Sequence, residues 1–202
     1  MRTTNWSKYW FVLMGVCMLA VTFPTKAIIP VTGGIFDRAD ALHNSQSEVV
    51  RIEVKGILDY PVAQQPAERP GFVSSVPDEV TQFAAPAQND VLAFLAHNYL
   101  AGDEFSEITE NTVVSVTYTD GSTQWFLVEA VEAYQALQPT SLFSDFRSLD
   151  TGELFDVQSI YDRVYGGSYP LVMQTCIEFE GNNVWGRLFI LAEPIDGNSV
   201  MH

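Results

Sequence analysis

The chain has 202 residues, of which 25 are acidic and ten are basic, so its net charge is −15 at pH 7. A field of this sign repels nucleic-acid phosphates and anionic lipid, which excludes nucleic acid as a partner and leaves the N-terminal segment as the only expected membrane contact. The length beyond the N-terminal segment suits one domain, which buries roughly 70% of its unfolded surface and needs no disulfide to form a core.

The N-terminus resembles an export signal. Basic residues precede an apolar run over residues 9–23, and Thr25 and Ala27 stand at the −3 and −1 positions of a cleavage site. The run is shorter than the ~20 residues of a membrane-spanning helix, so cleavage is favoured over an uncleaved anchor. We therefore assign residues 1–27 as a signal peptide or membrane anchor. The domain is expected to be extracytoplasmic, either secreted or held on the outer face of the cytoplasmic membrane.

Residues 28–48 have no hydrophobic period and contain many Gly, Pro, Asn and Ser residues, so we expect a tether. The domain then covers residues 49–202. Its first strand is predicted by the alternation of Val50, Ile52 and Val54 with charged residues.

The five prolines between residues 60 and 90 predict mostly loop, with one short helix near Val80. Residues 91–100 are apolar around His97, and they fit either a buried strand that turns at His97-Asn98 or a helix. Alternation over residues 114–118 and 125–131, with Asp120-Gly121 between them, predicts a β-hairpin.

The C-terminal half contains one helix and two strands. Apolar residues share one helical face over residues 153–164, and Gly166-Gly167 ends the helix. Two short apolar runs, residues 171–176 and 185–192, predict neighbouring buried strands. Many short strands with one clear helix favour a mostly β fold, a closed barrel with short helical inserts.

Cys176 is the only cysteine beyond the N-terminal segment, which itself contains Cys17. Exported proteins usually pair their cysteines or avoid them, so an unpaired one indicates a reactive thiol or an intermolecular bridge. A free cysteine also serves often as a small apolar core residue. Composition alone leaves these interpretations equal.

One histidine and one arginine fall within apolar segments of the domain. His97 is the candidate histidine, because His43 lies in the tether and His202 is terminal. Arg187 interrupts an apolar strand, where an unpaired charge costs several kcal/mol. Taken singly, a satisfied core histidine and a structural ion pair are the simpler interpretations.

Together, Cys176, His97 and Arg187 supply what cysteine catalysis needs. A cysteine thiol is mostly protonated at pH 7, so a nearby imidazole or cation must favour the thiolate. The attacked carbonyl then develops negative charge that a guanidinium can stabilise. We therefore predict that these three side chains form one site.

The order of the motifs separates the cysteine enzymes. Papain-like proteases place the cysteine before the histidine, and L,D-transpeptidases carry a Ser-His-Gly-Cys-type motif with an arginine two residues beyond the cysteine, where this chain has Glu178. A histidine segment at residues 96–98, then Thr175-Cys176 at the end of one strand and Arg187 on the next, resembles the sortases. Residues 52–62 resemble that family's first strand and the Pro-containing turn after it.

The resemblance implies a sortase-like closed barrel of about eight strands, with the three side chains meeting in a groove. It implies that Cys176 attacks a threonine carbonyl of a sorting signal, that His97 protonates the leaving amine and that Arg187 holds the substrate or its oxyanion. Thr175 and Asn98 would be substrate-binding residues that shape the groove. The partners would be an exported protein carrying the sorting signal and an amine acceptor of the cell envelope.

Two alternatives to a sortase-like transpeptidase stay open. One is a catalytically silent barrel of the same fold that binds peptides, and the other is a thiol hydrolase that releases the acyl-enzyme to water. No cofactor is expected. An acidic segment could supply Ca²⁺ ligands, but a solvated loop is the favoured interpretation; its residues are Asp103, Glu104, Glu107 and Glu110.

Overall fold

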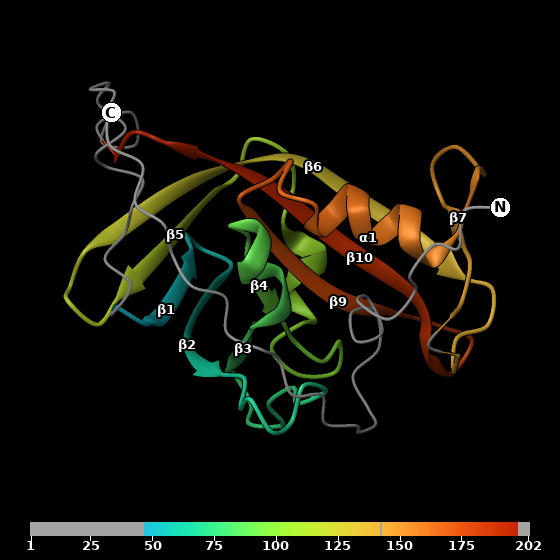
Figure 1. Cartoon of the computed structure of the whole chain (residues 1–202), viewed down its shortest axis with the longest axis horizontal. Coiled ribbons are helices and arrows are strands. Elements are labelled where there is room, and N and C mark those ends of the chain that lie inside the picture. The colour runs from blue at the N-terminus through green and yellow to red at the C-terminus, as the bar shows by residue number, and fades with distance from the viewer. Residues whose placement is uncertain (1–46, 142, 198–202) are drawn as a thin grey trace, which may run out of the picture.

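The computed structural model of the chain describes residues 47–141 and 143–197 (Figure 1). The predicted signal or anchor at residues 1–27 and almost all of the tether at 28–48 lie outside these residues. Within the described ranges, no helix is both long enough and apolar enough to cross a membrane.

Eight strands form a closed barrel, as the sequence predicts. Their order is β10-β9-β4-β3-β2-β1-β5-β6, and β6 pairs with β10 to close the sheet. Most neighbours are antiparallel, but β2–β3 and β4–β9 are parallel. The barrel strands are β1 (Val49–Val54), β2 (Leu58–Gln64), β3 (Val80–Phe83), β4 (Leu92–Leu95), β5 (Val113–Tyr118), β6 (Thr123–Ala136), β9 (Leu171–Phe179) and β10 (Asn182–Ile195).

Short elements decorate this barrel. The strands β7 (Phe146–Ser148) and β8 (Leu154–Phe155) extend the sheet beside the C-terminal end of β6, where β7 pairs with the last three residues of that strand. The single α-helix among the described residues, α1 (Val157–Tyr165), lies outside the barrel near β10 (Figure 1). The 3₁₀ turns η2 (Ala85–Asn89) and η3 (Glu104–Glu107) are the other helical inserts in the part of the chain that the structure describes.

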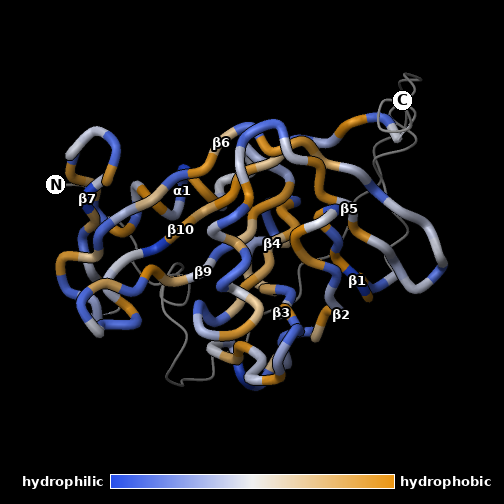
Figure 2. The backbone as a smooth tube through the Cα atoms, turned by 180° about the vertical axis from the view of Figure 1, so that it is seen from behind, coloured by the Kyte–Doolittle hydropathy of each residue, from blue (hydrophilic) through white to orange (hydrophobic). Residues whose placement is uncertain are grey.

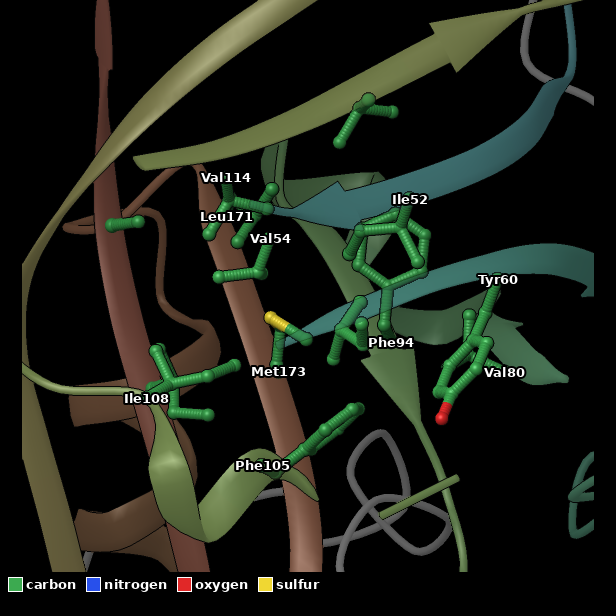
Figure 3. Close-up of a cluster of buried hydrophobic side chains, with 14 of the residues drawn as sticks. Ile52, Val54, Tyr60, Val80, Phe94, Phe105, Ile108, Val114, Leu171 and Met173 are labelled. Atoms are coloured by element: carbon green, nitrogen blue, oxygen red, sulfur yellow. The ribbon is translucent and has the colours of Figure 1, made fainter. Parts of the chain in front are cut away.

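The barrel encloses one hydrophobic core and carries a second on its outer face. Inside, Phe94, Phe105, Ile108, Leu171 and Met173 pack together with residues of the other strands (Figure 3). Outside, the helix packs over the other face of the strands; this second cluster includes Ala93, Val172, Phe189, Leu191, Ile160, Val164 and Tyr165.

Along β9 and β10, alternate side chains enter the barrel core and the outer cluster. The central part of β10 is therefore hydrophobic on both faces, which accounts for the continuous hydrophobic colour in the middle of that strand (Figure 2).

The Pro-rich segment departs from the prediction. Val80 lies in β3 rather than in a helix, because its side chain is buried in the barrel core. Pro61 lies within β2 rather than in a turn. Because β3 pairs only with Val62 and the residues after it, Pro61 has β1 as its only neighbouring strand, and its missing N–H is tolerated there.

Two other expectations are resolved in the structure. The segment around His97 is a strand, β4, that ends at Leu95. The predicted helix begins at Val157 rather than at residue 153, because the Asp156 carboxylate accepts a hydrogen bond of 2.7 Å from the Ser159 backbone N–H and caps the helix there.

Candidate functional site

The candidate nucleophile, Cys176, lies in β9 on the outer face of the barrel. Side chains alternate between the two faces of a strand, so Cys176 shares the face of Val172, four residues earlier. Val172 belongs to the outer cluster, whereas Met173 points into the barrel core (Figure 3). The Cys176 thiol is unpaired and its side chain is only half-buried. The sulfur is therefore not sealed within the barrel.

The candidate arginine is the direct neighbour of this cysteine across the sheet. Arg187 and Cys176 are antiparallel register partners, so their Cα atoms are about 5 Å apart and their side chains project from the same face. Arg187 lies on the same face of β10 as Phe189 and Leu191, which belong to the outer cluster.

Arg187 is buried without a carboxylate. Its side chain is only 2% exposed, and Nη1 donates to the carbonyl oxygens of Val184 (3.0 Å) and Gly186 (2.7 Å). Its Nε has no hydrogen-bond partner, and among the described residues no carboxylate forms an ion pair with it. The structural ion pair considered from the sequence is therefore absent from this part of the chain. A buried guanidinium with a free donor is suited to an oxyanion or a carbonyl.

His97 lies on the other side of Cys176, immediately beyond β4. The parallel register pairs Leu95 with Gln174, and the Ala96 N–H continues the ladder to the Gln174 carbonyl (3.2 Å). Extended by two more residue pairs beyond Leu95 and Gln174, this register would put His97 opposite Cys176. The structure therefore pairs Cys176 on β9 with Arg187 on β10 and puts His97 just after β4, the other neighbour of β9.

The segment after His97 is tightly held. The His97 carbonyl accepts from the N–H groups of Leu100 (2.9 Å) and Gly102 (3.0 Å). Gly102 is required by this packing, because a Cβ at that position would lie 2.3 Å from Thr175 Oγ1 and 2.8 Å from the His97 oxygen. These contacts fix the backbone from which the imidazole projects.

Thr175 and Asn98 also contribute to this arrangement. Thr175 is 4% exposed, and its hydroxyl donates to the Ala96 carbonyl (3.0 Å), so it supports the histidine segment from inside the sheet. The Asn98 amide donates to the Asn183 carbonyl (3.1 Å) and ties the same segment to the start of β10. Both predicted substrate-binding residues therefore lie beside the candidate triad, where they hold its backbone.

The His97 imidazole is half-buried and stacks on the exposed Tyr99 ring, with centroids 5.2 Å apart. Burial lowers the pKa of His97 below its ordinary value of 6.5, and a hydrogen bond with the Val73 backbone partly opposes this effect. The neutral imidazole is therefore favoured at pH 7. A neutral imidazole beside a thiol can accept its proton.

Sequence reasoning missed two residues of this region, Tyr165 and Gln174. Tyr165 is the last residue of α1, and its hydroxyl donates to the Gln174 side-chain oxygen. Gln174 precedes Cys176 by two residues and shares its face of β9. In the sequence, Gln174 could have been noticed as a polar residue that interrupts the apolar run of residues 171–176.

The acidic segment after His97 shows no metal-binding arrangement. Across the described residues, no group of three or more His, Cys, Asp or Glu side chains is placed to hold a metal ion. Glu104 instead accepts a hydrogen bond from the Tyr60 hydroxyl.

Comparison with known proteins gives structural similarity only. No protein-family model matches the chain, and no curated protein matches it significantly. Among solved structures, a lid mutant of sortase A from Corynebacterium diphtheriae is 14% identical, with a TM-score of 0.46 over 76% of this chain and 73% of that one. Sortase C1 from Streptococcus suis is 13% identical, with a TM-score of 0.48 over 76% of each chain. Sortase C from Clostridium perfringens, solved with the C-terminal cell wall sorting motif, is 13% identical, with a TM-score of 0.45 over 74% of this chain and 71% of that one.

Proposed function

We propose that the chain is a sortase-like cysteine transpeptidase of the cell surface. The observation that supports this most directly is the placement of Arg187. It is buried, has no carboxylate partner among the described residues, and is the register partner of a half-buried cysteine. A structural arginine would be expected to have an acidic neighbour, whereas an arginine that stabilises a transient oxyanion needs a free donor.

In the first half-reaction, the neutral imidazole of His97 accepts the thiol proton and the Cys176 thiolate attacks a backbone carbonyl of the sorting signal. A C–S bond forms, and the carbonyl oxygen becomes an oxyanion that Arg187 stabilises. The C–N bond then breaks, the leaving amine takes the proton from His97, and a thioester remains on Cys176.

In the second half-reaction, an amine of a cell-envelope acceptor attacks the thioester. His97 accepts the amine proton, a new amide bond forms, and the sulfur leaves as the thiolate. If water attacks instead, the product is a carboxylic acid and the protein is a hydrolase. The two activities share the first half-reaction, so only the fate of the thioester separates them.

The experiment incubates the full-length chain with a library of threonine-containing peptides, with and without an added amine, and follows it by intact-protein mass spectrometry. We expect a covalent adduct on the wild-type chain and on Cys17→Ala, the matched cysteine control, but not on Cys176→Ala. Peptide ligated to the amine establishes transfer, whereas cleaved peptide alone establishes hydrolysis. Peptide binding without any adduct would instead support the silent peptide-binding barrel.

The proposed location follows from the export signal in the sequence and from the envelope acceptor. The partners are an exported protein that carries the sorting signal and the amine acceptor, and no cofactor enters the reaction. Membrane contact is assigned only to the N-terminal segment.

A further inference from the structure

Gln174 is a polar residue on the apolar outer face of β9. Its register neighbours are Leu95 on β4 and Phe189 on β10, and both pack in the outer cluster. The Gln174 side chain is half-buried and lies on the same face as Cys176, two residues away. A half-buried amide among apolar neighbours costs free energy unless its polar atoms are paired.

Only one end of this amide is paired. The Gln174 side-chain oxygen accepts a hydrogen bond from the hydroxyl of Tyr165, the fully buried last residue of α1. Among the described residues, the amide nitrogen of Gln174 has no hydrogen-bond partner. Because Tyr165 occupies the oxygen, the nitrogen and its two hydrogens are left to donate to another group.

We propose that Gln174 is a specificity-determining residue, whose amide nitrogen donates to a carbonyl oxygen on a substrate side chain two residues from the attacked position. This inference rests on the proposed function and deepens it. Residues two apart on a strand are about 6.6 Å apart, and the same spacing separates alternate residues of an extended peptide. A peptide that lies along β9 with the attacked carbonyl at Cys176 therefore places the side chain two residues from the attacked position beside Gln174.

Tyr165 is the positioning residue of this pair. Burial raises the pKa of its hydroxyl well above the ordinary value of 10.0, so the group stays protonated and remains a donor throughout the physiological pH range. A hydrogen bond from a group that cannot ionise keeps the amide of Gln174 in one orientation. The site therefore prefers an acceptor on the substrate to a donor.

The test measures peptide binding rather than turnover, so that it does not depend on catalysis. Full-length Cys176→Ala protein is titrated into fluorescent seven-residue peptides centred on threonine. Each peptide carries either Asn or its near-isostere Leu, two residues before the threonine in one series and two residues after it in the other. The other positions are mixtures. Anisotropy gives the dissociation constants.

We expect one series to prefer Asn over Leu by about tenfold, which is the contribution of one hydrogen bond. Adding Gln174→Met, which keeps the length but removes the donor, should bring the two peptides within about twofold. Gln174→Glu keeps the acceptor for Tyr165 but lacks the donor, so it should also bring the dissociation constants of the two peptides within about twofold. Tyr165→Phe should reduce the preference for the Asn peptide. Thermal unfolding of each variant checks its fold.

Equal binding of the Asn and Leu peptides by the Cys176→Ala protein would overturn the proposal, as would a preference that survives Gln174→Met and Gln174→Glu in folded protein. Absence of any peptide binding would also overturn it. A clear Gln174-dependent preference without any adduct on wild-type Cys176 would refute the transpeptidase instead and leave the binding site standing, so the two failures are distinguishable.

Discussion

Cys176 and Arg187 are direct register partners on β9 and β10, with their side chains on the outer face of the barrel. The thiol is half-exposed, whereas the guanidinium beside it is almost completely buried. A cation fixed at this position acts on any negative charge that develops at the sulfur or at a carbonyl bound there. Its burial makes that interaction stronger than it would be in water.

Replacing Arg187 by methionine should leave the fold intact but remove the activity. No described carboxylate would lose its partner, and removal of the buried charge offsets the loss of the hydrogen bonds to the Val184 and Gly186 carbonyls, so the free energy of unfolding should change by no more than about 1 kcal/mol. Acylation of Cys176 should slow by roughly 10²- to 10³-fold. Denaturant unfolding and the rate of adduct formation measure the two effects.

The exposed Arg147 on β7 provides the matched control for this substitution. Arg147→Met removes the same charge from the chain but should not change the acylation rate. A marked loss of stability in Arg187→Met would instead indicate a structural arginine. Near-normal acylation in that variant would remove Arg187 from the proposed mechanism.

The lowered pKa of His97 predicts a specific pH dependence. Because burial disfavours the imidazolium in the folded state, the unfolded chain binds the proton more strongly. The contribution of His97 to stability is therefore fully present above the unfolded pKa of about 6.5 and declines as pH falls toward the folded pKa. Because His97 stays neutral and able to accept the thiol proton below pH 6.5, the rate of Cys176 acylation should also be maintained below pH 6.5.

Proton NMR of the histidine rings measures this midpoint. The chain has three histidines, so His97→Gln identifies the resonance by its disappearance. We expect the His97 midpoint to lie below 6.5, and Tyr99→Ala to move it upward because the stacked ring no longer shields the imidazole. A His97 midpoint at or above 6.5 would contradict the burial argument.

The barrel and the three candidate side chains could be predicted from the sequence because each depends on a strong local pattern. Alternation marks β1, β5 and β6, and the apolar runs mark β9 and β10. The prediction that the three residues converge rests on the expectation that the strands of Cys176 and Arg187 are neighbours, to which the resemblance adds the histidine segment. The structure places Cys176 and Arg187 on adjacent strands and His97 two residues beyond the end of β4, which neighbours β9 on its other side.

The remaining features depend on contacts between distant segments. Val80 was assigned to a helix because the prolines around it mask a strand that only β2 and β4 stabilise. The pairing of Tyr165 with Gln174 was missed because nothing in the spacing of a helix and a strand indicates which side chains meet. The short strands β7 and β8 exist only as an extension of β6 and have no periodicity of their own.

The close packing at Gly102 predicts a large effect of a single methyl group. In Gly102→Ala the new Cβ would lie against Thr175 Oγ1 and the carbonyls of Ala96 and His97, all within 3 Å. The backbone must shift, which should cost about 1–3 kcal/mol of unfolding free energy. Because the shift also displaces His97, acylation should fall even under conditions where the protein stays folded.

A second substitution tests the origin of this effect. Thr175→Ala removes the nearest of the three atoms, so Gly102→Ala combined with Thr175→Ala should be less destabilised than the sum of the single variants. Gly121→Asn is the control, because Gly121 lies in open space at a positive φ that asparagine tolerates. Additivity of the two substitutions would show that Thr175 does not limit the space at Gly102.

The helix that carries Tyr165 is attached to the barrel by an ion pair that should control its stability in acid. Arg163 on α1 donates from Nε to both carboxylate oxygens of Glu132 on β6, at 3.0 and 2.8 Å, and the Tyr134 hydroxyl donates to the same carboxylate at 2.7 Å. Burial raises the pKa of Glu132, but the hydrogen bonds from Arg163 and Tyr134 outweigh it, so the pKa lies below its ordinary value of 4.5.

The stability that comes from this lowered pKa is fully present above about pH 4.5 and is lost as pH falls through the folded pKa. Because Arg163 is half-exposed, we expect Arg163→Met to cost only about 1 kcal/mol at pH 7 and less at pH 3. The exposed pair Arg51 and Asp59 is the control, and Arg51→Met should leave the unfolding midpoint unchanged at both pH values. If Arg163→Met is equally destabilising at pH 7 and pH 3, the loss comes from packing of the arginine stem, and the carboxylate does not hold the helix in place.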